Sequence, residues 1–227
     1  MLLEIKPLDD IYNYRVVADG CIDIVFNCTN YDETCIMGYC NSFVKIGIDK
    51  EFNYFGIRFL PGIFPLLFNI DASELSNHYE RLNTVQPRIY NVIQQSKDRC
   101  LCLQDLCDEL NIYFIKHINK IDKPFDNRFF CALETILKSK GSIIIEKDLN
   151  GGISSRHLQR LFNFYIGDTA KSFCRIVRFQ NLLKIDPSVK LIKSEKSYYD
   201  FGYYDQTHFI KEFKLFYGKT PSKIAAE

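Results

Sequence analysis

SSRHLQRLFNFYIG, from Ser154 to Gly167, and DQTHFIKEFKLFYG, from Asp205 to Gly218, repeat each other at a constant offset of 51 residues. Each copy begins with a residue that caps helices, carries basic residues inside, and ends with a glycine, which commonly terminates a helix. Apolar residues recur at helical spacing in both copies, so each is predicted to be an amphipathic helix. Such a repeat indicates two copies of one structural unit.

The residues around the two copies also predict helices. A long one is expected from Asp168 or Thr169 to about Ile185, and at about 1.5 Å per residue it spans roughly 25 Å. Three shorter helical segments are expected at 129–137, at 144–149 and from Thr220 onward. The last hundred residues are therefore predicted to be entirely helical.

Two short helices joined by a tight turn, the second capped and basic, form a helix-turn-helix, whose second helix enters the major groove of DNA. The pattern predicts two such units. The long connecting helix is suited to hold their reading helices about one DNA turn apart, on one face of the duplex.

The charge distribution agrees with this division. From Phe125 onward the chain has 17 Lys and Arg against 11 Asp and Glu, whereas the first 124 residues have 12 basic and 17 acidic residues. The net charge of +1 therefore combines a basic half, suited to phosphates, with an acidic half. We expect the boundary between 118 and 124, with domains at 1–120 and 121–227.

The N-terminal half reads as strands followed by helices. Short β-branched and aromatic runs predict strands at 21–28 and 54–59, and further strands are expected at 34–37 and 42–48. Apolar spacing becomes helical after Pro61 and Gly62, and a longer helix is expected from Asp98 to about Ile118. The predicted fold class is α+β, with a small β-rich, sensor-like first domain and an all-helical second domain.

Several other classes of protein are disfavoured. The longest apolar stretch, Leu60 to Ile70, is too short to span a bilayer, and the start MLLEIKPLDD does not resemble a signal peptide, so a cytoplasmic location is expected. Nine cysteines are expected as reduced thiols rather than disulfides or metal ligands. No catalytic pairing, phosphate-cradling glycine loop or metal cluster emerges, so neither an enzyme nor a cofactor is expected.

Two polar residues stand inside strand-like apolar runs of the first half. Asp23 and Arg58 either line a ligand pocket or form a structural ion pair, and the sequence leaves both readings open.

The C-terminal hundred residues resemble the DNA-binding domain of the AraC/XylS family of transcription regulators. The resemblance rests on SSRHLQRLF with Gly167, on Arg175 and Arg178 in the connecting helix, and above all on GYYDQTHFIKEFKLFYGKTPSKI, Gly202 to Ile224. DGCIDIVFN at 19–27 and FGIRFLPG at 55–62 are similar to one type of N-terminal domain in that family.

The resemblance implies particular DNA contacts. The outward positions that face bases are Arg156, Gln159 and Arg160 in the first reader and Gln206, Thr207 and Lys211 in the second. The residues suited to phosphates are Ser154, Ser155, Lys214 and Lys219. Double-stranded promoter DNA is the expected partner. Further candidate partners are RNA polymerase, a small-molecule or protein effector at the first domain, and a second copy of the chain.

The sequence departs from the family pattern in the helix that supports each reader. Lys147 and Asp148, then Ser197 and Tyr198, stand at positions where an apolar residue and a small alanine are usual, and Glu195 stands where leucine is usual. The leading hypothesis is a sequence-specific transcription regulator modulated through its first domain. The alternative is an interaction protein that binds other transcription proteins with little intrinsic affinity for DNA.

Overall fold

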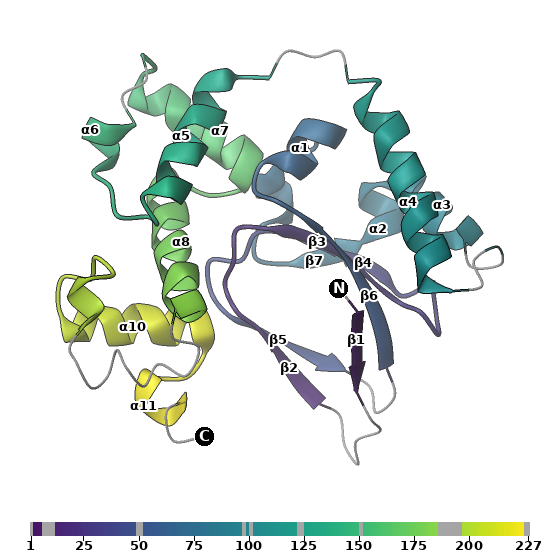
Figure 1. Cartoon of the computed structure of the whole chain (residues 1–227), viewed down its shortest axis with the longest axis horizontal. Coiled ribbons are helices and arrows are strands. Elements are labelled where there is room, and N and C mark those ends of the chain that lie inside the picture. The colour runs from purple at the N-terminus through teal and green to yellow at the C-terminus, as the bar shows by residue number, and fades with distance from the viewer. Residues whose placement is uncertain are drawn as a thin grey trace.

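The computed structural model describes residues 2–5, 12–48, 52–96, 99, 102–121, 125–149, 152–185 and 197–224. A β-rich first part is followed by a helical second part (Figure 1), which confirms the predicted α+β class. The strands are β1 (Leu2–Ile5), β2 (Tyr12–Val16), β3 (Ile22–Asn27), β4 (Thr34–Met37), β5 (Val44–Ile48), β6 (Phe52–Phe59) and β7 (Tyr79–Arg81).

Helices complete the first part and form the second. Those of the first part are α1 (Ile63–Phe68), the 3₁₀ turn η1 (Ala72–Leu75), α2 (Leu82–Val85), α3 (Pro87–Ser96) and α4 (Leu103–Ile118). Those of the second part are α5 (Asn127–Lys138), α6 (Ile145–Asp148), α7 (Ser155–Ile166), α8 (Ala170–Ile185), the 3₁₀ turn η2 (Ser197–Tyr199), α10 (Gln206–Tyr217) and α11 (Pro221–Ile224).

The first part is built on an antiparallel sheet with strand order β1-β6-β3-β4-β7, beside a separate antiparallel pair of β2 and β5. Alternate residues Ile22, Ile24 and Phe26 of the central strand β3 are buried. They share one apolar cluster with residues of α3 and α4, so these helices cover that face of the sheet.

The second part has its own core. It gathers the apolar faces of α5, α7, α8 and α10, which come together because each helix repeats its buried residues every three or four positions. Ala18 and Tyr39 of the first part also belong to this cluster and are fully buried. The two parts are therefore packed against each other.

Polar contacts follow the same interface. The Tyr39 hydroxyl lies 2.8 Å from Ser172 Oγ, and Gln180 Nε2 donates to the Ala18 carbonyl oxygen at 2.6 Å. The Ala18 amide in turn donates to the carbonyl oxygen of Phe216 at 3.0 Å. Both the linker helix α8 and the end of α10 are thus tied to the first part.

Candidate nucleic-acid interface

The first reading helix is α7, and its start is defined by a side-chain cap. Ser154 Oγ accepts from the His157 backbone N–H at 3.2 Å, which satisfies one of the amides left free in the first turn. Leu158, Phe162 and Ile166 are buried beneath the helix. The predicted base-reading residues Arg156, Gln159 and Arg160 are all exposed on its other side.

The second reading helix, α10, repeats this design. Asp205 Oδ1 accepts from the His208 backbone N–H at 2.7 Å, and Phe209, Phe213 and Phe216 are buried. The predicted readers Gln206, Thr207 and Lys211 are exposed. In both copies the apolar face therefore packs inward and leaves the polar face to solvent.

The predicted phosphate-contacting residues differ in their surroundings. Ser155 and Lys214 are exposed, whereas the Ser154 hydroxyl is engaged as the helix cap and Lys219 is half-buried. The first-turn amides of α7 lie beside Ser154 and Ser155, and a helix start of this kind attracts anions.

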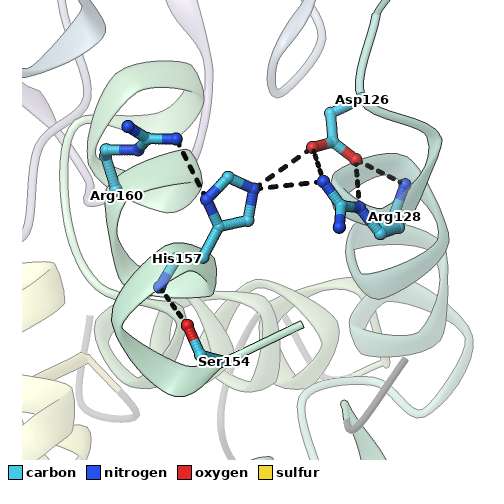
Figure 2. A network of polar contacts seen from close by, with 5 residues as sticks. All are labelled: Asp126, Arg128, Ser154, His157 and Arg160. Atoms are coloured by element: carbon cyan, nitrogen blue, oxygen red, sulfur yellow. Dashed lines mark hydrogen bonds and ion pairs between the residues drawn. The ribbon is translucent and has the colours of Figure 1, made fainter. Parts of the chain in front are cut away.

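A network of polar side chains connects the start of α5 to the first reading helix, α7 (Figure 2). Asp126, the N-cap of α5, accepts from Arg128 Nε at 2.9 Å and from Arg128 Nη2 at 2.7 Å. The same carboxylate lies 3.3 Å from His157 Nε2, and His157 Nδ1 lies 3.0 Å from Arg160 Nη2. The hydrogen bonds from Arg128, and the weaker contribution of His157, hold the pKa of Asp126 well below its usual value.

Both ring nitrogens of His157 have polar partners. An arginine only donates, so Nδ1 is placed to accept from Arg160, while Nε2 lies 3.3 Å from both the Asp126 carboxylate and Arg128 Nη2. The imidazole therefore connects Asp126 and Arg128 to a predicted base-reading arginine. Sequence patterns did not reveal this network of side chains, because Asp126 lies 31 positions before His157.

The matching histidine of the second reader has different partners. His208 Nε2 lies 3.3 Å from Glu212 Oε1, and the same buried carboxylate pairs with Arg175 of the linker helix α8. Arg175 also lies over the ring of Phe216, with 5.4 Å from its guanidinium carbon to the ring centroid. The repeat thus places one histidine beside a predicted base-reading arginine and the other beside a buried carboxylate.

The elements that support the readers are short. α6 has four residues, and Asp148 Oδ2 accepts from the Ile144 backbone N–H at 2.7 Å, which gives this unusual residue a local role. Beneath α10, the buried ring of Tyr198 stacks on the Phe209 ring with an interplanar angle of 8°. The buried Tyr203 ring also packs on Phe209, at an interplanar angle of 66°. Two tyrosines therefore supply packing beneath α10; Glu195 lies outside the described residues.

Asp23 and Arg58 lie opposite each other on β3 and β6. Arg58 donates to both carboxylate oxygens of Asp23, at 2.9 and 2.6 Å, and also pairs with Asp19 at 2.9 Å. The Arg58 side chain is 50% exposed, so the pair lies at the surface of the sheet rather than deep within it. A cavity of about 180 Å³ is lined by residues that include Met37 and Cys40, and neither Asp23 nor Arg58 lines it.

Side chains that could ligate a metal are dispersed over the described part of the chain. Within it, no group of three or more His, Cys, Asp or Glu side chains is placed to hold a metal ion. Burial raises the pKa of both the Cys40 and the Cys174 thiol to about 11. None of the helices described is long and apolar enough to cross a membrane.

Comparison with known proteins matches two parts of the chain to family models. Residues 151–227 match a helix-turn-helix domain, and residues 2–81 match a domain of unknown function (DUF6597). Among curated proteins nothing matches.

Two solved structures are similar to the chain as a whole. Both are crystal structures of ToxT from Vibrio cholerae, an apo variant from strain SCE256 and the protein of strain O395. Each is 14% identical with a TM-score of 0.46, and the alignments cover 100% and 99% of this chain and 96% and 95% of ToxT.

The assignment therefore rests on the family model and on the two capped helices that it covers. Residues 151–227 form an AraC-type helix-turn-helix domain and residues 2–81 match a domain of unknown function, and the chain is a DNA-binding transcription regulator.

Proposed function

We propose that α7 and α10 enter successive major-groove segments of promoter DNA and that the N-terminal domain controls how the two helices are placed. The observation that carries this proposal is the shared design of the two helices: each has a side-chain cap, a buried apolar face and an exposed polar face, and α8 joins them. A helix of 16 residues spans roughly 24 Å, which suits readers about one DNA turn apart.

In this proposal the first reader carries most of the sequence preference. Arginine bonds guanine through two hydrogen bonds and glutamine does the same to adenine, so Arg156, Gln159 and Arg160 suit direct readout. The second reader offers Gln206, Thr207 and Lys211, a set with a single cation. Ser155 and Lys214 are suited to phosphate contacts, which position the protein without reading sequence.

The proposed domains, 1–120 and 121–227, are supported by the two apolar clusters and by the change in charge near residue 124. Control by the first domain is supported by its contacts with the far ends of both readers. Ser76 Oγ donates to the Gly167 carbonyl oxygen at 2.9 Å, and the Phe43 amide donates to that of Leu215 at 3.0 Å. An effector or a second copy that moves the first domain would therefore move both readers.

The test is selection of duplexes from random-sequence DNA by the full-length chain, followed by binding assays on the selected duplex at physiological salt. We expect Arg156→Ala and Arg160→Ala each to cost about 1–3 kcal/mol on the selected duplex and to relax the preference at one base position. Failure of the wild-type chain to select any sequence would favour the alternative, an interaction protein that binds other transcription proteins.

A further inference from the structure

A hollow runs between the two reading helices, and its walls carry proposed base readers. Its larger part, about 630 Å³, is lined by residues of α6, α8 and α10 that include Lys171, Lys211 and Glu146. Its smaller part, about 280 Å³, is lined by α6, the start of α8 and the exposed face of α7 with Ser155 and Gln159. Ile145, Glu146 and Lys171 line both parts, so the two adjoin.

The cations of this hollow fall into two groups. Arg175 is paired with the buried Glu212, and Arg178 Nη2 donates to the Gly141 carbonyl oxygen at 3.1 Å. Lys171 and Lys211 are exposed, and neither has an ion pair or hydrogen bond within the described residues. These two ammonium groups are therefore available to an anion from outside the protein.

The position of the hollow identifies the anion. Gln159 lines one end and Lys211 the other, so a duplex seated on both readers passes over the whole length between them. Duplex DNA carries about one negative charge per 1.7 Å of helix axis, and the stretch between two successive major-groove segments necessarily brings phosphates there. Lysine binds phosphate as a point charge on a flexible stem and needs no rigid geometry.

We infer that the hollow between α7 and α10 is a binding site for the DNA phosphodiester backbone, with Lys171 as its central ligand between the proposed base readers Gln159 and Lys211. This inference rests on the proposed function and adds a site on the linker helix, which the family resemblance did not assign to DNA. Glu146 faces the same hollow and opposes the binding of phosphate. The balance between Lys171 and Glu146 sets how much this site contributes to affinity.

The experiment measures binding of the full-length chain to its selected duplex and to a scrambled duplex across a salt series. We expect Lys171→Gln to weaken binding to both duplexes about three- to ten-fold and to reduce the slope of log affinity against log salt by about one. Glu146→Gln should strengthen binding to both, an effect that loss of a structural contact would not produce. Lys184→Gln is the matched control, because Lys184 is an exposed lysine of the same helix that lines neither part of the hollow.

The outcomes separate this inference from the proposed function. If Arg160→Ala relaxes sequence preference while Lys171→Gln behaves like Lys184→Gln, the backbone site is wrong and the proposed function stands. If the wild-type chain binds no duplex, both are overturned. Circular dichroism and the thermal midpoint of each variant establish that the exposed substitutions leave the fold intact, so a change in affinity reports on the site.

Discussion

At the scale of single residues, the connection from Asp126 through His157 to Arg160 gives a direct prediction. His157→Ala removes the acceptor that holds the Arg160 guanidinium, so we expect weaker binding and a relaxed preference at the base that Arg160 reads. His157→Gln, which keeps a side chain with both a donor and an acceptor, should recover part of the loss. The measurement is the affinity for the selected duplex and for duplexes that are changed at single positions.

A double-mutant cycle distinguishes positioning of Arg160 from a general effect. If His157 acts through Arg160, His157→Ala should have little further effect in an Arg160→Ala background. His208→Ala in the second reader is the comparison, since within the described residues the His208 ring is bonded to the buried Glu212 and the Tyr204 amide rather than to a predicted base reader. Independent, additive losses from His157→Ala and Arg160→Ala would contradict the positioning role.

A second residue-scale prediction concerns the ion pair between α8 and α10. Glu212 is 4% exposed, and Glu212→Ala leaves Arg175 and His208 without its carboxylate. Because Arg175 keeps partial access to water, we expect a loss of about 1–3 kcal/mol in the free energy of unfolding. Glu134→Ala, which breaks an exposed pair with Lys138, should cost under about 0.5 kcal/mol, and urea unfolding of both variants checks the contrast.

At the scale of elements, α8 makes the proposed spacing of the two readers testable. An uninterrupted helix of 16 residues transmits a defined separation and rotation from one reader to the other. Insertion of five base pairs between the two half-sites turns the second half-site by about half a helical turn, so we expect affinity to fall to that of a single half-site. Retention of full affinity would mean that the readers act independently.

The elements also show where sequence patterns succeed. Strands β3, β4, β5 and β6 and the two readers were predicted because β-branched and aromatic runs or helical spacing mark them, and α7 and α10 carry recognisable caps as well. Strands β1, β2 and β7 were not predicted. β7 has three exposed residues and exists through its pairing with β4, so its own sequence lacks the apolar alternation that marks a strand.

At the scale of the whole molecule, the glycines that end the two readers meet the N-terminal domain. Gly167 and Gly218 have backbone φ angles of 98° and 87°, and this left-handed conformation alone favours glycine at both positions. A Cβ on Gly167 would lie 2.1 Å from Ser76 Oγ, and one on Gly218 would lie 2.7 Å from the Phe43 ring. The repeat therefore marks two helix ends and also two points of contact between the domains.

These contacts predict how the first domain affects DNA binding. Ser76→Ala and Phe43→Ala each remove one contact at the end of one reader, without altering a residue proposed to touch DNA. We expect each to change the affinity for a two-half-site duplex while the affinity for a single half-site stays the same, because only the relative placement of the readers is altered. Equal changes on both duplexes would contradict control through reader placement.

The amino-acid sequence alone carries the helix-turn-helix assignment, because capping residues, glycines and apolar spacing act within one or two helical turns. It also predicted the α+β class and the exposed faces of both readers for the same local reason. Packing in three dimensions brings distant groups together: Asp126 with His157, Arg175 with Glu212, and Lys171 with the hollow between the readers. Those contacts depend on how whole helices pack, and no local pattern records that.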